Sequence, residues 1–364
     1  EGVANNVDIK FNLRVWSGPD QEYISEPTEI VINVKNAILL YGVYSEDMVL
    51  NTEQEYLISN NLIFVGNSVL TINPGTILKF SNQASLTMQE NSQMIANGTI
   101  DSQIIFTSET DRWAGIKFPS NIRSELSYAT VELISSSGGS NGYLFDSASD
   151  NIEVENVIFK DNDLYSFASS GPSYHSGQKA GFNKINIFEN NFYNGVFWFR
   201  YEDWWWPRFD DINIINNKQE PSYPGSPTGT ITFTETDFSL APEMRINVLN
   251  SWTENSNYNT CLFAITNGNS VVQNVRAYPG TSDPEKINSL ILDAYNNPNV
   301  SGLVLRDFLS PIPYEEAHGI VWKIEVNGFD AQDEYALLDP LGVGEHEFKV
   351  YFNREMDTSV NPQV

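Results

Sequence analysis

The feature that most constrains this fold is an apolar pair, spaced i, i+2, that recurs every eight residues within residues 68–118. A pair with this spacing fits a short β-strand that points two side chains to one face. The motifs Asn73-Pro74-Gly75 and Asn97-Gly98 mark sharp turns between such strands. Short strands, sharp corners and a fixed stride predict a chain that coils upon itself as a β-solenoid. Four consecutive pairs are Leu70/Ile72, Leu78/Phe80, Leu86/Met88 and Met94/Ala96.

The same kind of pair also recurs on a longer period, at intervals of 26 to 34 residues. Three eight-residue strides and their corners account for one period, so we predict three strands in each rung. We expect the pairs to point into the core, with Ile104, Val157, Ile212 and Val275 on one vertical stack. The pairs are Leu78/Phe80, Ile104/Phe106, Val131/Leu133, Val157/Phe159, Ile185/Ile187, Ile212/Ile214, Ile246/Val248, Val275/Ala277 and Leu303/Leu305.

Polar residues occur five positions after the first member of several pairs, at Asn162, Asn190, Asn217 and Ser251. Stacked side-chain amides in successive rungs can hydrogen-bond to one another as a ladder. The alternative is that Asn simply favours corners of the chain. Both interpretations predict that the chain turns at these residues.

Residues 70–80, 105–108 and 113–118 resemble the right-handed parallel β-helix repeats of large bacterial surface and secreted proteins. Residues 185–192 resemble the same repeat class, which also includes pectate-lyase-like enzymes. The resemblance covers about two thirds to three quarters of the chain. It implies an all-β fold class, a right-handed parallel β-helix of about nine to ten rungs. It does not assign a function, because this scaffold hosts lyases, hydrolases, adhesins and inert spacers.

The two ends of the chain differ in pattern from the repeats. Residues 1–35 contain two alternating strands, which we interpret as a cap on the first rung or as the end of a preceding β-sandwich. The predicted β-helix occupies residues 36–317. Residues 318–364 resemble the truncated start of a bacterial Ig-like domain, on the segment from Phe348 to Asp357, and a whole Ig sandwich needs about 100 residues. We therefore expect partial β-sandwich elements at opposite ends of a rod, within a longer natural chain.

Composition limits the partners of the chain. Forty-seven acidic and 20 basic residues give a net charge of −27, and such a surface repels nucleic acid and anionic membranes. The single cysteine, Cys261, excludes an internal disulfide. No apolar run reaches the length of about 18 residues that a membrane span needs. An extracellular bacterial protein without disulfides fits these limits as well as a cytosolic one does, and the resemblance favours the extracellular location, at the cell surface or secreted.

The most unusual local sequence is residues 196–211, which combine tryptophans with arginines and carboxylates. Three consecutive tryptophans cannot all point inward on a strand, because a strand alternates its faces. An exposed Trp ring stacks on the C–H groups of a sugar while neighbouring charges bind its hydroxyls, so we predict a glycan-binding face. The alternative is an aromatic corner covered by a loop. The predicted ligand-binding residues are Trp198, Tyr201, Trp204, Trp205, Trp206 and Tyr223.

The same segment also permits an enzyme. Glycosidases use two carboxylates about 5 to 10 Å apart, and a pectate-type lyase would need a Ca²⁺ site with an Arg or Lys base. Ca²⁺ is therefore the one cofactor that we keep open, although no lyase signature is present. The candidate catalytic residues are Arg200, Glu202, Asp203, Arg208, Asp210 and Asp211, and the metal candidates are Asp161 and Asp163. In a chain with 47 acidic residues such pairs also arise by chance.

These observations lead to one leading prediction and one alternative. The leading prediction is a structural or adhesive β-helix module of a larger surface or secreted protein, which binds glycan through the Trp-rich rung and adjoins other modules of its own chain. The alternative is a polysaccharide lyase or glycoside hydrolase of the pectate-lyase-like class. A flat aromatic platform would favour binding, whereas a deep groove with convergent carboxylates and a cation would favour the enzyme.

Overall fold

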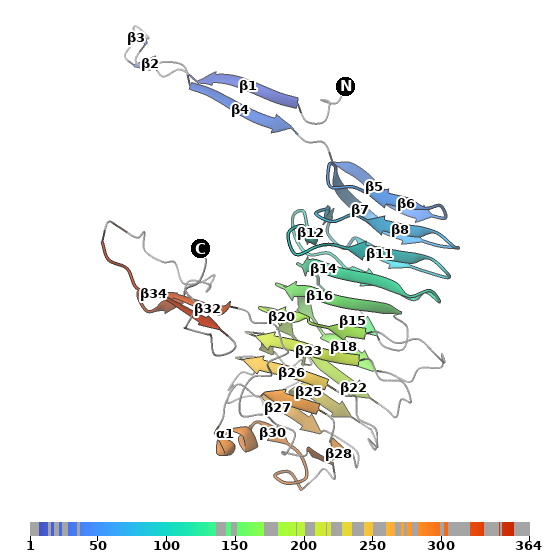
Figure 1. Ribbon diagram of the computed structural model, residues 1–364, viewed down its shortest axis with the longest axis vertical. Helices are drawn as coiled ribbons and strands as arrows, with labels where there is room; N and C mark the ends of the chain where they lie inside the picture. Colours follow the sequence, from blue (N-terminus) through green and yellow to red (C-terminus); the bar gives the residue numbers. More distant parts are fainter. Residues whose placement is uncertain are drawn as a thin grey trace.

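The computed structural model shows an all-β chain wound into a parallel β-helix (Figure 1). The predicted fold class is therefore confirmed. Within the residues that the structure describes, no helix is long and apolar enough to cross a membrane. The structure describes residues 37–135 without a gap, and also 7–13, 16–17, 22–23, 28–34, 143–146, 151–170, 181–193, 195–200, 208–215, 217–219, 228–234, 244–249, 260–265, 271–272, 275–278, 283–298, 302–304, 321–330, 342 and 344–352.

One face of the β-helix, here called the anchor face, carries the predicted core stack. Its parallel strands follow one another in the order β5 (Ile38–Tyr44), β7 (Glu55–Phe64), β9 (Ile77–Phe80), β12 (Ile104–Ser108), β14 (Ser124–Glu132), β16 (Ile152–Lys160), β20 (Asn186–Phe188), β23 (Arg208–Ile215), β26 (Met244–Leu249) and β29 (Val275–Tyr278). Their register joins Ile38, Tyr56, Leu78, Phe106, Val131, Phe159, Ile187, Ile214 and Val248 in one stack. The stacked side chains from Tyr56 to Ile214 are buried, so removal of apolar surface from water holds the rungs together.

The register predicted from the sequence is correct at some rungs and displaced by two residues at others. Ile212 and Ile246 pair as predicted. Ile104, in contrast, pairs with Ala129 and not with Val131. Ala129 in turn pairs with Val157, so Ile104 and Val157 still lie on one stack. A slip of two residues keeps the same side chains inward, because the side-chain period of a strand is two.

The last predicted rungs depart further from expectation. Val275, expected on the vertical stack, pairs with Met244, and Ala277 takes the place beside Ile246. Leu303 pairs with β28 and is 37% exposed, so it is not a member of the anchor face. The chain inserts the short helix α1 (Pro284–Ser289) between β29 on the anchor face and β30 (Ile291–Leu292) on another face of the rung, so Leu303 follows that face and does not lie on the anchor face.

Two further faces complete each rung, as the prediction of three strands requires. The polar face contains β6 (Met48–Leu50), β8 (Val69–Ile72), β11 (Gln93–Asn97), the first halves of β14 and β16, then β19 (Gly181–Asn183) and the start of β23. The third face contains β10 (Ser85–Met88), β13 (Gly115–Lys117), β15 (Tyr143–Asp146), β18 (Ser166–Ser170), β22 (Phe197–Arg200), β25 (Thr228–Thr234), β27 (Thr260–Ile265) and β30. Short strand sets lie at corners: β17 (Asp163–Leu164), β21 (Asn191–Phe192) and β24 (Lys218–Gln219), and β28 (Val271–Val272) with β31 (Leu303–Val304).

Aromatic rings from several rungs fill the core beneath the third face. Phe145 meets Phe159 and Phe167 edge to face, with ring centroids 5.7 and 5.3 Å apart. Phe167 also contacts Phe182 and Phe197 at 5.5 and 5.8 Å. Edge-to-face pairs of this kind add about 0.5–1.5 kcal/mol beyond the area that they bury.

Left-handed backbone conformations turn the chain between the polar face and the anchor face. Tyr128, Asn156, Lys184 and Asp211 occupy this corner in successive rungs, and their φ angles lie between 46° and 55°. Leu133 has φ 61° at the next corner, after the anchor face, where it is half-buried and packs against the core instead of lying fully inside it as predicted. Positive φ is unfavourable for residues other than glycine, so the rung geometry, and not local preference, selects it at these positions.

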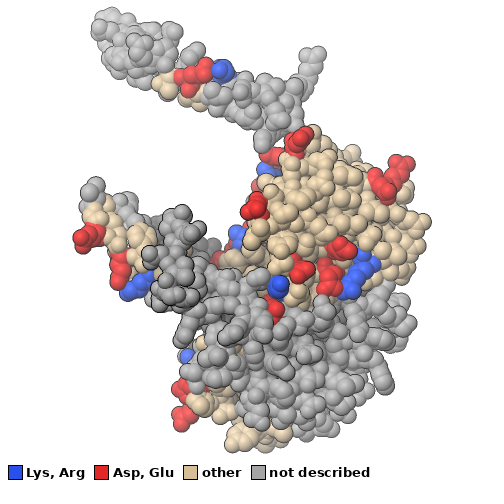
Figure 2. Space-filling view, viewed as in Figure 1, with Lys and Arg blue, Asp and Glu red and all other residues tan. Residues whose placement is uncertain are grey.

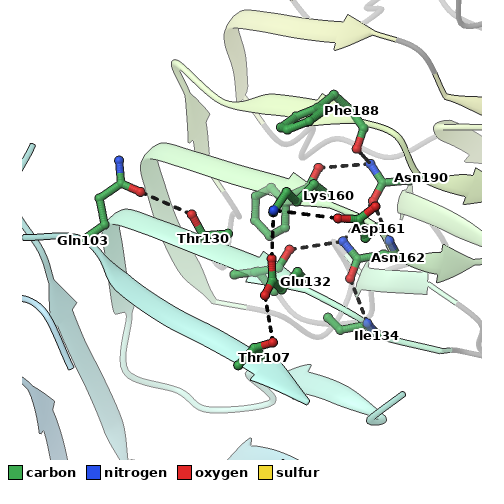
Figure 3. Close-up of polar contacts among 12 residues, drawn as sticks. Gln103, Thr107, Thr130, Glu132, Ile134, Lys160, Asp161, Asn162, Phe188 and Asn190 are labelled. Carbon is green, nitrogen blue, oxygen red and sulfur yellow. Dashed lines mark hydrogen bonds and ion pairs between the residues drawn. The ribbon is translucent and has the colours of Figure 1, made fainter. Parts of the chain in front are cut away.

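Asn162, Asn190 and Asn217 form a buried amide ladder along one corner, and Figure 3 shows Asn162 and Asn190 of this ladder. The Nδ2 of Asn162 donates to Oδ1 of Asn190 at 2.9 Å, and the Nδ2 of Asn190 donates to Oδ1 of Asn217 at 2.9 Å. Each accepting oxygen also accepts a backbone hydrogen bond: Asn190 Oδ1 from the N–H of Asn162, and Asn217 Oδ1 from the N–H of Asn190, both at 3.0 Å. The predicted ladder is confirmed for these three residues, and Ser251 lies outside the described residues.

The flanks of the β-helix are antiparallel. At the N-terminus β1 (Val7–Leu13) pairs with β4 (Thr28–Val34), and β2 (Trp16–Ser17) pairs with β3 (Glu22–Tyr23). At the C-terminus β32 (Val321–Val326) pairs with β33 (Phe329–Asp330) around Asn327-Gly328, whose φ angles of 52° and 84° fit a type I′ turn, and with β34 (Phe348–Phe352). Figure 1 shows β1 and β4 beyond the first rung, as expected. In contrast, β32 and β34 lie beside the rod, and the expectation that the C-terminal strands lie at its far end is wrong.

Candidate functional site

The outer surface of the polar face carries two parallel rows of polar side chains, here called the polar rows. Leu126, Val154 and Phe182, which lie between the rows in sequence, point inward and are at most 1% exposed. Strand alternation therefore directs the residues on either side of them outward. The register stacks Glu125 on Glu153 in the first row, and Asn97, Ser127, Glu155 and Asn183 in the second row.

Hydrogen bonds cross from rung to rung within the polar rows. Asn97 donates through Nδ2 to Glu125 Oε2 at 3.0 Å and accepts from the Ser127 hydroxyl at 3.0 Å. Asn183 donates through Nδ2 to Glu155 Oε1 at 3.1 Å. These bonds fix the side chains at the surface while their remaining donors and acceptors face outward, so the rows offer both kinds of hydrogen-bonding group.

Glu153 is held at the centre of this surface by two neighbours. Arg123 forms an ion pair with its carboxylate, and their side chains are 50% and 31% exposed. Gly181 lies at the same position of the next rung, and a Cβ there would sit 2.7 Å from both carboxylate oxygens of Glu153. A side chain at position 181 would therefore displace the Glu153 carboxylate from this place, which its flexible and partly exposed side chain allows.

Two of the predicted catalytic residues continue the polar rows. Arg208 pairs with Gly181 and Asp210 pairs with Asn183, so their backbone positions extend the first and second rows respectively. Asp211, the next residue, is different: it occupies the left-handed corner and is 5% exposed. The structure therefore separates Asp211 from the surface on which we expected it.

Trp198 and Arg200 belong to another part of the rung. Both lie in β22, on the third face, where Trp198 pairs with Ser169 and Thr232. The other predicted ligand-binding and catalytic residues lie outside the described residues, namely Tyr201, Glu202, Asp203, Trp204, Trp205, Trp206 and Tyr223. Their contribution to a site stays a prediction.

The metal candidates Asp161 and Asp163 flank the buried Asn162. Asp161 has φ 54° at the corner and lies 3.8 Å from Lys160 Nζ, while Asp163 accepts from Asn191 Nδ2 at 3.3 Å. Across the part of the chain that the structure describes, no three His, Cys, Asp or Glu residues are grouped as metal ligands. The Ca²⁺ site stays a prediction that these two residues do not complete.

A second polar cluster lies on the anchor face, around Lys160 (Figure 3). Lys160 Nζ is 3.1 Å from Glu132 Oε2, and Glu132 Oε1 accepts from Thr107 Oγ1 at 2.8 Å. Burial lowers the pKa of Lys160, but the hydrogen bond and charge of Glu132 and the charges of Asp161 and Glu189 together outweigh it and raise the pKa. Lys160 is therefore a cation that its carboxylate neighbours stabilise, and it links Glu132 to Asp161 at the corner of the rung.

Sequence reasoning missed Arg123, Glu125, Glu153 and Glu155. The available signal was a short pattern that precedes the anchor pairs, a carboxylate followed two residues later by a second polar residue, as in Glu125-Leu-Ser127 and Glu153-Val-Glu155. In a chain of this acidity the pattern is inconspicuous. Only the register shows that its copies stack.

A family model described as a pectate-lyase like beta helix domain matches residues 42–131. This segment includes Asn97, Glu125 and Ser127 of the polar rows, and its match supports a parallel β-helix protein without assigning an activity. A search of curated proteins found no match, and a search of solved structures found none either.

Proposed function

We propose that this protein binds an extended, uncharged polysaccharide along the polar rows, as a β-helix module of a larger surface or secreted protein. The observation that carries the proposal is the in-register stacking of Glu125 on Glu153, and of Ser127, Glu155 and Asn183, on one exposed sheet face. A surface of this kind presents hydrogen-bonding side chains on successive rungs, about 4.8 Å apart, although their chemistry changes from Asn and Ser to Glu along the rows. An extended polymer of sugars presents hydroxyls at regular intervals too, so the two repeats suit one another.

The chemistry of the rows supports a carbohydrate ligand. Carboxylates accept hydrogen bonds from hydroxyls, and Asn side chains both donate and accept, so the rows can bind a hydroxyl in either role. The Trp-rich segment immediately precedes Arg208, whose backbone continues the first row. Aromatic rings placed at the end of the rows would add stacking contacts to a sugar ring.

The charge of the surface supports an uncharged polymer. The rows hold the carboxylates of Glu125, Glu153 and Glu155, and Asp210 continues the second row; Arg123 is paired with Glu153, and Arg208 continues the first row. The whole chain carries a net charge of −27. A polyuronate would be repelled by both, whereas a neutral glycan is not.

The test compares polysaccharide binding by matched carboxylate variants. Glu153→Ala and Glu155→Ala should each weaken binding to a neutral polysaccharide, in affinity gels cast with xylan, glucomannan or cellulose derivatives, by about tenfold or more, equivalent to about 1.4 kcal/mol. Glu132→Ala, from the anchor-face end of the same strand β14 that carries Glu125, is the control and should bind like the wild type. Trp204→Ala and Trp206→Ala test the aromatic contribution.

Two outcomes would overturn the proposal. The first is a wild-type protein that is retarded by none of the neutral polysaccharides, or by polygalacturonate alone. The second is equal loss of binding in Glu132→Ala and Glu155→Ala, which would place the ligand elsewhere. Melting curves of each variant separate lost binding from lost folding, since exposed carboxylates contribute little to stability.

A second candidate function, cleavage of the polysaccharide, has one observation in its favour. Glu153 and Glu155 lie two residues apart on one face of β16, a separation of about 6–7 Å along the strand. Carboxylate pairs in glycosidases are about 5 to 10 Å apart. Release of new reducing ends from the same polysaccharides by the wild type, abolished in Glu153→Gln and Glu155→Gln, would establish the enzyme in place of the binding module.

A further inference from the structure

The first rung leaves the core of the β-helix open at its N-terminal end. Among the described strands, β5 pairs with β7 and β6 pairs with β8, so the other edge of each has no strand partner. Ile38, the first residue of the core stack, is 39% exposed, whereas Tyr56 and Leu78 behind it are 3% and 0% exposed. An open edge with an exposed core residue is a site for addition of another strand.

Exposed apolar side chains surround this open end. We call them the N-terminal collar, which consists of Ile38 and of Leu39, Tyr41, Val43 and Val49, the last four being 53%, 59%, 66% and 56% exposed. Leu57 and Ile63, which occupy the positions of Leu39 and Val43 in the next rung, are only partly exposed. Leu57 and Ile63 are less exposed than the collar residues because β7 has a neighbouring rung on each side. A rung added to the open edge of β5 would lower the exposure of the collar side chains to that of Leu57 and Ile63.

The strands of the collar carry no charge, although Glu46 and Asp47 are exposed in the turn that joins them. The strands β5 and β6, with the sequences ILLYGVY and MVL, contain no acidic or basic residue. The molecule as a whole carries a net charge of −27, so two copies repel one another over most approaches. Figure 2 shows that uncharged residues cover most of the surface near the first rungs. The collar strands themselves therefore add no charge repulsion to a contact between two copies.

We propose that the N-terminal collar is the interface of a dimer, in which two copies of this chain place their first rungs edge to edge around a twofold axis. A second copy presents the same open, uncharged strands, and a twofold contact is closed and self-complementary. The β1–β4 hairpin of the same chain does not pair with β5 among the described strands, and in Figure 1 it stands beyond the rung and does not lie across it. The dimer buries Ile38, satisfies the edges of both β5 strands and doubles the length of the rod.

Sedimentation velocity tests the proposal over about a hundredfold range of concentration, from about 1 μM upward. The wild type should convert from monomer to dimer, and Tyr41→Lys and Val43→Lys should each weaken the dimer by about tenfold or more because they place charge in the contact. Val49→Lys on β6 repeats the test on a second strand. Ile100→Lys is the matched control, since Ile100 is 77% exposed but lies in a turn outside the collar.

Salt gives an independent readout. Because the collar is uncharged and the bodies repel, added NaCl should strengthen the dimer by screening that repulsion. A wild type that stays monomeric throughout, a dimer that the three collar variants leave unchanged, or assemblies that grow beyond two copies would each overturn the proposal. Equal dissociation by Ile100→Lys would do the same. Circular dichroism of each variant checks that it retains the fold. We expect it to do so, because the substituted side chains are exposed and lie outside the buried core.

Discussion

The N-terminal half of the β-helix, residues 37–135, and the C-terminal half, residues 143–304, share one core stack but turn their corners with different chemistry. In the first half buried hydroxyls close the turns: those of Ser68, Thr76 and Ser92 donate to the carbonyl oxygen three residues earlier at 2.7–2.8 Å. In the second half the buried amides of Asn162 and Asn190 bond to the next rung. The hydroxyls of Thr76 and Ser92 also reach backbone carbonyls of the preceding rung, at 3.4 and 3.0 Å, so the difference is that the amide corner joins rungs side chain to side chain.

The difference shows how one solenoid can vary its loops without losing its stack. The first half has short turns throughout, and it contains the whole segment, residues 42–131, that resembles the pectate-lyase like family. In the second half the amide ladder holds one corner in place while the chain between β22 and β23 carries the tryptophans. The polar rows cross the junction, with Asn97 and Glu125 from one half and Glu153 and Glu155 from the other.

The largest effect is expected from a charge placed in the shared stack. Ile185 is 0% exposed, and Ile185→Asp would bury a carboxyl group without a partner, at a cost of several kcal/mol that forces neutralisation or local unfolding. Stability in a solenoid comes from contacts between adjacent rungs, so hydrogen exchange should accelerate around β16, β20 and β23 while β9 to β12 stay protected. Ile122→Asp, at a residue that is 42% exposed, is the control. Uniform loss of protection would show that both halves unfold as one unit.

An intermediate effect should distinguish the two kinds of corner. Asn190→Ala removes donors to Asn217 Oδ1 and to the backbone of Phe159, and leaves buried groups of Asn162 without their acceptor. Each such unsatisfied group costs about 1–3 kcal/mol. Ser92→Ala, at an equally buried hydroxyl, should cost less, about 1 kcal/mol, because its bonds end on carbonyl oxygens alone. Urea unfolding of both variants makes the comparison, and equal losses would contradict it.

The fold was predictable from the sequence because apolar burial is periodic. Pairs such as Ile187 and Ile214 are visible as a repeat, and the position of Asn162 after its pair predicts the amide ladder. The exact register was not predictable, because a slip of two residues keeps the same side chains pointing inward, as at Ile104 and Ala129. Left-handed corners such as Leu133 carry no sequence signal of their own.

The candidate site was less predictable than the fold. The Trp-rich segment is conspicuous in composition, but the surface that the structure describes is built around Glu153, whose neighbours Arg123 and Gly181 are 30 and 28 residues away in sequence. Such a cluster depends on the length of each rung. No local sequence pattern predicts the cluster around Glu153, and its carboxylates do not stand out in a chain with 47 acidic residues.

The smallest effect concerns Lys160, which belongs to the second half and bonds back to Glu132 of the first. Its pKa is raised in the folded protein, so the stabilisation is present in full below pH 10.5 and is lost as the pH rises through the folded pKa. The side chain is 34% exposed, so water screens the pair and Lys160→Met should cost about 1 kcal/mol or less at neutral pH. The difference between wild type and Lys160→Met in urea unfolding should therefore shrink at strongly alkaline pH. A difference that stays constant across this range would mean that the aliphatic stem, and not the charge, makes the contact between the halves.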